Sequence, residues 1–223
     1  MWSNHSGFKV AVDKLIKIYI NDVLAAELVA SPVELAELAV GYAYINGVMP
    51  EDIEIKGGVV KIYAQTAVGG KKVFEDCGPA EAVAKLPKFA RFRWGQLMEL
   101  AREFQKLTMP VVEPQLAMHT SALYVDGRWV VAHDVSRHSG VLKLVGKILL
   151  EGLPAYRAVA FTTGRASGDM VQRLALAAVP AVVSLRGPLY SGVEAACSGG
   201  MLLVANVRGV GFKPLCGEEL LEY

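Results

Sequence analysis

The sequence has few cysteines, and none of them form a pair spaced like metal ligands. Among its 223 residues only Cys77, Cys197 and Cys216 are cysteines, and they are far apart. Any pairing of three thiols leaves one over, and no Cys-x-x-Cys is present. His119, His133 and His138 lie near one another in the sequence, but no two share a helix face at ligand spacing. We therefore expect neither a disulfide framework nor a metal site.

The chain also lacks an excess of charge. Its formal net charge is +1 and its pI is about 7.7. No overall positive field would attract a polyanion, so we expect no nucleic-acid partner. Any anionic ligand must instead be held by a local cluster of cations.

Long hydrophobic runs are missing as well. No apolar stretch approaches the roughly 20 residues of a membrane span, and the opening MWSNHSGFKVAVDKL has no basic segment followed by an apolar one. We expect a cytoplasmic protein without a membrane partner. Since 53% of the residues are hydrophobic, the chain can bury one large core or two smaller ones.

Residues 1–75 are predicted to form a small α+β unit. The stretches KLIKIYI and VLAAELVA alternate apolar and polar residues around Asn21-Asp22, which predicts a hairpin. SPVELAELAVGYAYING predicts a helix, with Ser31 and Glu34 as a capping box and Asn46-Gly47 as its end. DIEIKGGVVKIYAQT predicts a second hairpin around two glycines.

Residues 76–107 are predicted to hold a cysteine-bearing loop and a helical connection. VGGKKVFEDCGPAE is rich in glycine and charge and carries Cys77, which favours a mobile loop. Helices are expected at 80–86 and 94–107. The proline-containing stretch LTMPVVEPQLAM then leads into the second half of the chain.

Residues 108–223 are predicted to form an α/β domain. HTSALYV and RWVVAH flank Asp126-Gly127 as a hairpin, and SGVLKLVGKILLEG carries the apolar stripe of a helix. RAVAF, PAVVSL and MLLVANV are short continuous apolar runs separated by helical segments. This alternation is typical of buried parallel strands joined by right-handed crossovers.

Each of these three apolar runs ends in a loop with arginine and glycine. The loops contain Thr163-Gly164-Arg165, then Arg186, then Arg208. Ligands of open α/β sheets gather at the carboxyl ends of the strands, and arginine binds phosphate through a bidentate fork. A single loop arginine is more often just solvated, but three at equivalent positions favour a phosphate site.

The stretch AHDVSRHSGVLKLVG has two interpretations. The first is a helix start, with Asp134 or Ser136 as the cap, His138 half-buried and Lys143 and Lys147 solvated. Alternatively, its polar side chains line a second wall of the ligand cleft. The residues alone favour neither.

Four segments in order resemble the formate dehydrogenase accessory sulfurtransferases (FdhD). They are SPVELAELAVGYAYINGVMPEDIE, HTSALYVDG, HDVSRHSGVLKLVG and TTGRASGDMVQRLALAAVPAVVS. The resemblance implies a cytosolic homodimer whose larger domain is a three-layer α/β fold similar to cytidine deaminase. It also implies transfer of sulfur from a cysteine desulfurase to the molybdenum or tungsten cofactor of formate dehydrogenase, bound through its two guanine dinucleotide arms.

The resemblance also implies a set of binding residues, for which GDP would serve as a fragment of the cofactor. Three of the quoted segments supply them: His119, Asp134, Arg137, His138 and Lys143 from the two histidine-containing ones, and Thr163, Gly164, Arg165, Ala166 and Ser167 from the TTGRAS turn. Arg186 and Arg208 join the set because they follow the other two apolar runs.

Sulfur transfer needs an exposed thiolate that can hold a persulfide and reach both donor and acceptor. Cys77 in the glycine-flanked loop suits this role, whereas Cys197 lies in a helical segment where burial is the ordinary expectation. Many members of the family carry C-G-x-C-G here, but this chain has Ala80 in place of the second cysteine. A cofactor-binding chaperone that moves no sulfur is therefore the alternative. Zinc deaminase chemistry is not expected, since His-x-Glu and Cys-x-x-Cys are missing.

Overall fold

In a computed structural model of the chain, the structure describes residues 2–65, 85–86, 90–108 and 117–223. The N-terminal part contains a hairpin of β1 (Trp2–His5) and β2 (Phe8–Ala11), followed by a mixed sheet in the order β4-β3-β6-β5. The sheet strands are β3 (Lys14–Ile20), β4 (Val23–Ala30), β5 (Asp52–Lys56) and β6 (Val59–Tyr63). Both predicted hairpins are confirmed, and the β1–β2 hairpin was not predicted.

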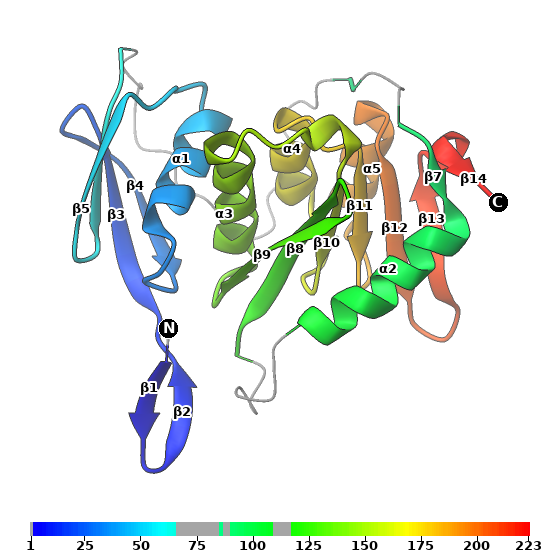
Figure 1. Cartoon of the computed structure of the whole chain (residues 1–223), viewed down its shortest axis with the longest axis horizontal. Coiled ribbons are helices and arrows are strands. Elements are labelled where there is room, and N and C mark those ends of the chain that lie inside the picture. The colour runs from blue at the N-terminus through cyan, green and yellow to red at the C-terminus, as the bar shows by residue number, and fades with distance from the viewer. Residues whose placement is uncertain (1, 66–84, 87–89, 109–116) are drawn as a thin grey trace.

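One face of this sheet is covered by helix α1 (Leu35–Ile45), as Figure 1 shows. Alternate residues of β3, such as Ile16 and Ile18, are fully buried beneath the helix with Leu38 and Tyr42. The opposite face of β3 is partly exposed, so the strand has the period of two expected of a half-buried sheet.

The predicted start of α1 is wrong. The helix begins at Leu35, after Glu34 in a left-handed conformation (φ 52°), and Ser31 does not cap it. The polar groups of Ser31 bind the large domain instead: its N–H donates to the Asp134 carboxylate, and its hydroxyl accepts from Val135 N–H at 3.2 Å. Glu34 pairs with Lys147 at 2.6 Å. Contacts with the other half of the chain therefore outcompete the local capping box.

The large domain is built on a sheet of six strands in the order β13-β12-β11-β10-β8-β9. The strands are β8 (His119–Val125), β9 (Arg128–Asp134), β10 (Val159–Thr162), β11 (Ala181–Ser184), β12 (Leu202–Val207) and β13 (Gly211–Cys216). β10, β11 and β12 are parallel as predicted, whereas β8 runs antiparallel to β10. The first residues of β8 therefore lie at the edge where β10 ends.

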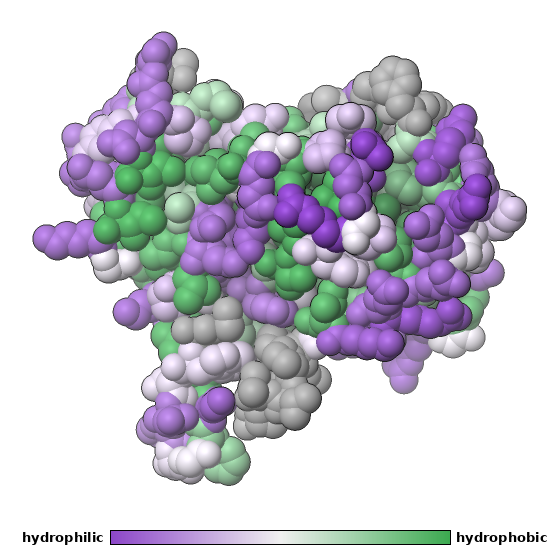
Figure 2. Space-filling view, in the orientation of Figure 1, coloured by the Kyte–Doolittle hydropathy of each residue, from purple (hydrophilic) through white to green (hydrophobic). Residues whose placement is uncertain are grey.

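Helices cover both faces of this sheet (Figure 1). Helix α2 (Trp94–Leu107) lies on one face, and α3 (Arg137–Leu150), α4 (Gly168–Leu176) and α5 (Tyr190–Gly199) lie on the other. Along β10, Phe161 packs in the α2 cluster and Ala160 packs in the α3–α5 cluster. Burial on both faces explains the continuous apolar runs. Figure 2 shows hydrophilic residues gathered over the outer side of α2.

The two halves of the chain meet where α1 crosses α3. A Cβ added to Gly41 would lie 1.9 Å from the carbonyl oxygen of Leu142, and one added to Gly146 would lie 1.9 Å from that of Glu37. The two helix backbones therefore touch directly, and only glycine fits at either position. This crossing fixes the N-terminal unit against the large domain.

The C-terminal segment contains a disulfide, contrary to the prediction from the sequence. After β13, the 3₁₀ helix η2 (Glu218–Leu220) leads to β14 (Leu221–Glu222), which pairs with β7 (Phe92–Arg93). A disulfide joins Cys197 of α5 to Cys216 of β13, with Cα atoms 5.2 Å apart, although no disulfide was predicted. The sequence separates these cysteines, but the packing of α5 beside β13 brings them within bonding reach.

Within the described ranges, no helix combines the length and the apolar character needed to cross a membrane. Most of the predicted helix at 80–86, the cysteine-bearing loop and most of the proline-containing connection fall on residues outside the described ranges. The three predicted domain boundaries and the likeness to cytidine deaminase remain predictions.

Candidate functional site

A cleft of about 610 Å³ opens at the edge of the large sheet where β10 and β11 end. The start of β8, the start of α3 and the end of α2 complete its walls. The lining residues are Gln105, Thr108, Met118, His119, Thr120, Arg137, Thr163, Gly164, Arg165, Leu185 and Arg186. Three arginines and a histidine contribute, and this described lining contains no carboxylate. The cleft therefore suits an anion.

The turn after β10 is held by Thr163. Its N–H donates to the carbonyl of Thr120 and its hydroxyl accepts from the N–H of Thr120, both at 3.0 Å. The same hydroxyl lies 3.4 Å from Nδ1 of His119. Because β8 is antiparallel to β10, these hydrogen bonds extend the strand pairing by one residue and bring His119 to the cleft.

Gly164 allows the side chain of Arg137 to lie against this turn. A Cβ added to Gly164 would lie 3.0 Å from Cδ and 3.1 Å from Cβ of Arg137. Such contacts are tighter than van der Waals packing normally permits, so a larger residue would push the arginine away. The glycine of the TTGRAS turn thus makes room for an arginine contributed by α3.

Ser184 is a site residue that the sequence analysis missed. It is fully buried at the end of β11, and its hydroxyl donates to the carbonyl of Gly164 at 2.8 Å and accepts from the N–H of Arg186 at 3.1 Å. One hydroxyl therefore sets the relative position of the two arginine-bearing turns. A serine that ends an apolar strand just before Leu-Arg-Gly was the available signal.

Ala166 and Ser167 lie behind the cleft and not on its surface. Both are buried, and the carbonyl of Ala166 accepts from Leu189 N–H at 2.8 Å. The hydroxyl of Ser167 donates to the carboxylate of Asp169 at the start of α4. The TTGRAS turn is therefore divided, with Thr163, Gly164 and Arg165 facing the cleft and the last two residues anchoring it.

A second charged group lies behind this anchor. The carboxylate of Asp169 is 3.2 Å from Nε2 of His138 and 3.2 Å from a guanidinium nitrogen of Arg173. Burial alone would raise the pKa of Asp169, but its contacts with His138, Arg173 and Ser167 bring that pKa below its ordinary value. His138 is thus buried beside an anion of the protein and does not line the cleft.

Asp134 and Lys143 are also outside the cleft. Both are completely buried, their charged groups lie 2.6 Å apart, and Lys143 donates to the carbonyl of Ser31 at 3.2 Å. The interpretation of Lys143 as solvated is wrong, because the N-terminal unit covers it. Ser136 caps α3 by accepting from Ser139 N–H, as one of the two interpretations predicted.

The last two predicted site residues, Arg208 and Cys77, are not among the described lining of the cleft. Arg208 follows β12 in an exposed turn and does not line the cleft. Cys77 lies outside the described residues. The structure therefore brings together His119, Arg137, Thr163, Gly164, Arg165 and Arg186.

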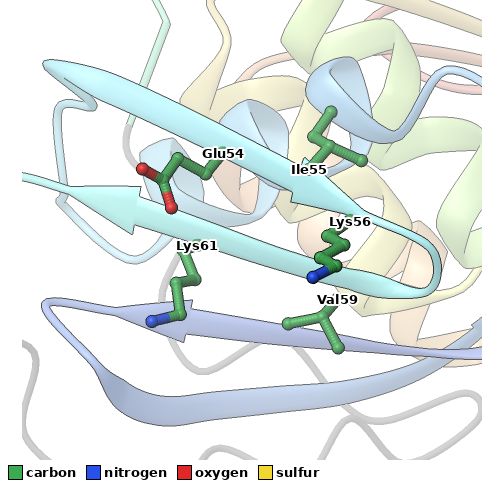
Figure 3. A pocket seen from close by; sticks show the side chains of 5 residues that line it. All are labelled: Glu54, Ile55, Lys56, Val59 and Lys61. Carbon is green, nitrogen blue, oxygen red and sulfur yellow. The ribbon is translucent and has the colours of Figure 1, made fainter.

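Another cavity, of about 540 Å³, lies on the β5–β6 hairpin, and the close view in Figure 3 shows its lining residues. Its side chains are those of Glu54, Ile55, Lys56, Val59 and Lys61. Lys61 already pairs with Asp22 at 2.6 Å. This cavity is lined by a single hairpin whose charges are of both signs, so it suits an anion less well than the arginine-lined cleft does. Across the described part of the chain, histidine, cysteine and acidic residues form no cluster of three suited to a metal ion.

Comparisons with known proteins place these features in a family. The sulfur carrier protein FdhD of Methanothermobacter thermautotrophicus is 25% identical over 226 residues, covering 92% of this chain and 88% of that protein. FdhD of Streptomyces avermitilis is 36% identical over 105 residues, covering 46% of this chain and 37% of that protein.

The fold is also similar to a crystal structure. A proposed formate dehydrogenase accessory protein from Desulfotalea psychrophila superposes with a TM-score of 0.80 at 25% identity, covering 100% of this chain and 97% of that one. The sequence model of the FdhD/NarQ family matches residues 11–221. A match over nearly the whole chain, together with the shared fold, shows that this protein belongs to the FdhD/NarQ family.

Proposed function

We propose that this protein is a sulfur carrier that supports the maturation of formate dehydrogenase. Relatives aligned along most of the chain carry the name sulfur carrier protein FdhD, which supports the role. The observation that carries the proposal furthest is the cleft that Arg137, Arg165 and Arg186 line together. Such a cleft suits a ligand with several phosphates.

The proposed cargo is a molybdenum or tungsten cofactor with two guanine dinucleotide arms. Each arm carries a pyrophosphate, which guanidinium groups bind through paired, charge-assisted hydrogen bonds. Arg165 and Arg186 lie on turns held together by Ser184, so their spacing is fixed before the ligand arrives. Thr163 and His119 would supply further hydrogen-bonding groups beside them.

Cys77 is the proposed sulfur carrier. Its thiolate would attack the outer sulfur of a persulfide on a cysteine desulfurase, forming a new S–S bond while the donor's S–S bond breaks and the donor thiolate leaves. The outer sulfur would then pass to the cofactor: the S–S bond at Cys77 breaks, the Cys77 thiolate leaves and is regenerated, and the metal of the cofactor would supply the two electrons that reduce the transferred sulfur to sulfide. Pairing of Cys197 with Cys216 leaves Cys77 as the remaining thiol of the chain, which supports this assignment.

The remaining parts of the proposal concern partners and place. A cysteine desulfurase would be the donor, formate dehydrogenase the client, and the protein would act as a homodimer in the cytoplasm. Sedimentation of the purified protein would test the dimer directly.

The deciding experiment is mass spectrometry of the intact protein after incubation with a cysteine desulfurase and cysteine. We expect one added sulfur, about 32 Da by the atomic mass of sulfur, on Cys77 and none on a Cys77→Ser variant. Addition of dithiothreitol should remove it, since thiols reduce persulfides. A protein that stays unlabelled while a known acceptor is labelled would instead be a cofactor-binding chaperone.

A further inference from the structure

A second basic hollow lies at the opposite end of the strands of the large sheet from the cleft. The cleft lies beyond Thr162 at the end of β10, whereas this hollow borders Val159 at its start. It has a volume of about 220 Å³ and lies between the start of α2 and the end of β8. Since β10 has four residues, the two places are about 10 Å apart along the strand.

Three arginines from two separate segments line the hollow. Arg91 and Arg93 precede α2, and Arg157 belongs to the 3₁₀ helix η1 (Ala155–Arg157) before β10. Their convergence comes from the tertiary fold, because Arg157 is far from the other two in sequence. The structure thus gathers positive charge at a place that no sequence motif marked.

Neutralisation of this charge is incomplete. Arg157 pairs with Asp126 at 3.0 Å, and Arg93 is 4.0 Å from Glu222. Within the described part of the chain, Arg91 has no ion pair, and the first turn of α2 contains no acidic side chain. Three guanidinium groups therefore face two carboxylates, only one of which is close.

The floor of the hollow strengthens the effect of that charge. Leu97, Leu100 and Val159 line it and are 2%, 6% and 4% exposed. An apolar, low-dielectric wall focuses the field of the nearby cations and weakens their screening by water. Gln96 and Tyr124 add neutral hydrogen-bonding groups at the rim.

We propose that this hollow, named here the α2 hollow, is a second anion-binding site that takes a phosphate-sized oxyanion. Its volume is about a third of that of the cleft, so it suits one phosphate group better than a dinucleotide. Arg91 and Arg157 supply forked donors, and the planar guanidinium matches a tetrahedral oxyanion through two oxygens. The ligand is either free inorganic phosphate or a phosphate group of a nucleotide.

The test is a titration of the full-length protein with inorganic phosphate at constant ionic strength. Calorimetry and ³¹P NMR measure the binding. In an Arg165→Ala background, which removes an arginine of the cleft, we expect saturable binding that weakens at least tenfold when Arg91→Gln/Arg157→Gln is added. Arg102→Gln removes the same kind of charge from an exposed position of α2 outside the hollow and should bind phosphate normally.

GDP distinguishes the two sources of the anion. If GDP competes with phosphate in the Arg165→Ala background, the natural ligand includes a nucleotide phosphate, and if it does not, the site takes the free ion. Phosphate binding in the Arg165→Ala background that survives addition of Arg91→Gln/Arg157→Gln, or that is already lost in Arg165→Ala alone, overturns the proposal. So does binding of an acidic peptide such as hexaglutamate in the absence of any phosphate binding, because the hollow would then recognise protein.

A folded double variant is expected, since the Arg157–Asp126 pair is exposed and contributes little stability.

Discussion

The carboxylate of Asp134 and the ammonium of Lys143 form an ion pair of 2.6 Å in which neither side chain has exposed surface. Ser31 completes their surroundings, since its N–H donates to the carboxylate and its carbonyl accepts from the ammonium. The pair therefore joins the N-terminal unit to the start of α3. Ser31 in the N-terminal unit and Asp134 and Lys143 in the large domain are far apart in the sequence, but their polar groups bind one another in the fold.

Replacing one partner of this pair should be costly. Asp134→Asn preserves the shape of the side chain but leaves the ammonium of Lys143 buried without an opposite charge. We expect the free energy of unfolding to fall by about 3–5 kcal/mol, as is common for broken buried ion pairs. Urea denaturation followed by circular dichroism measures this loss.

The double variant Asp134→Asn/Lys143→Met is the control. It removes both charges, so it should be more stable than Asp134→Asn alone. Equal stability of the single variant and the original protein would mean that the Lys143 ammonium finds another partner or loses its proton.

The low pKa of Asp169 predicts an acid-sensitive fold. Because its folded pKa is below the ordinary value, the ionised carboxylate stabilises the native state above pH 4, and this contribution is lost as the pH falls through the folded pKa. The free energy of unfolding should therefore decrease on acidification below about pH 4. Asp169→Asn should flatten that decrease in urea titrations between pH 2 and pH 6, whereas Asp52→Asn, at an exposed strand position, should leave its slope unchanged.

The close α1–α3 crossing predicts that adding a methyl group at Gly41 destabilises the fold. Gly41→Ala places a Cβ within 1.9 Å of a backbone oxygen, so the helices must separate. We expect a loss of roughly 1–3 kcal/mol or more, as found for overpacked cores, seen as a lower midpoint of thermal unfolding. Gly95→Ala is the matched helical control, because nothing lies within 4 Å of its added Cβ. A Gly41→Ala protein as stable as that control would show that the crossing is looser than described.

Nucleotide binding should depend on Arg165 and not on Arg208. Arg165→Ala removes a forked donor from the cleft, and we expect GDP affinity to fall by about 1.5–3 kcal/mol. Arg165→Lys should recover part of it, since lysine keeps the charge but not the fork. Calorimetric titration with GDP measures both. Arg208→Ala should bind GDP normally because its turn does not line the cleft, and unchanged affinity in Arg165→Ala would remove that residue from the site.

The disulfide between Cys197 and Cys216 should stabilise the C-terminal part of the chain. It closes a loop with a sequence separation of 19 residues. Chain entropy for a loop of this size corresponds to about 3 kcal/mol. Cys197→Ser should lower the free energy of unfolding by that order under oxidising conditions and by far less in dithiothreitol. Free-thiol titration of the untreated protein should find one reactive thiol, and three would show that the pair is reduced.

Much of the fold follows from local sequence patterns. The hairpins, α2, α3 and the parallel strands were predicted because period, turn residues and apolar runs agree at each of them. The start of α1 was not, since Ser31 and Glu34 match a capping box but bind Asp134 and Lys147 instead. A local pattern cannot reveal a partner about a hundred residues away.

The site was predictable to a similar degree. Strand order alone places Arg165 and Arg186 at one edge, and the structure confirms that both line the cleft. Strand order does not indicate that Arg208 lies in an exposed hairpin turn away from the cleft. Nor does it indicate that the N-terminal unit buries Lys143. Both facts depend on which elements pack over the sheet, and composition does not determine that.

Direct contact between the backbones at Gly41 and Gly146 also limits how the protein can move. Helices separated by long side chains can slide as those chains change rotamer, but here each backbone meets the other with no side chain between them. Rotation of one unit about the other would first require the helices to come apart. We therefore expect the N-terminal sheet and the large domain to move together as one rigid body.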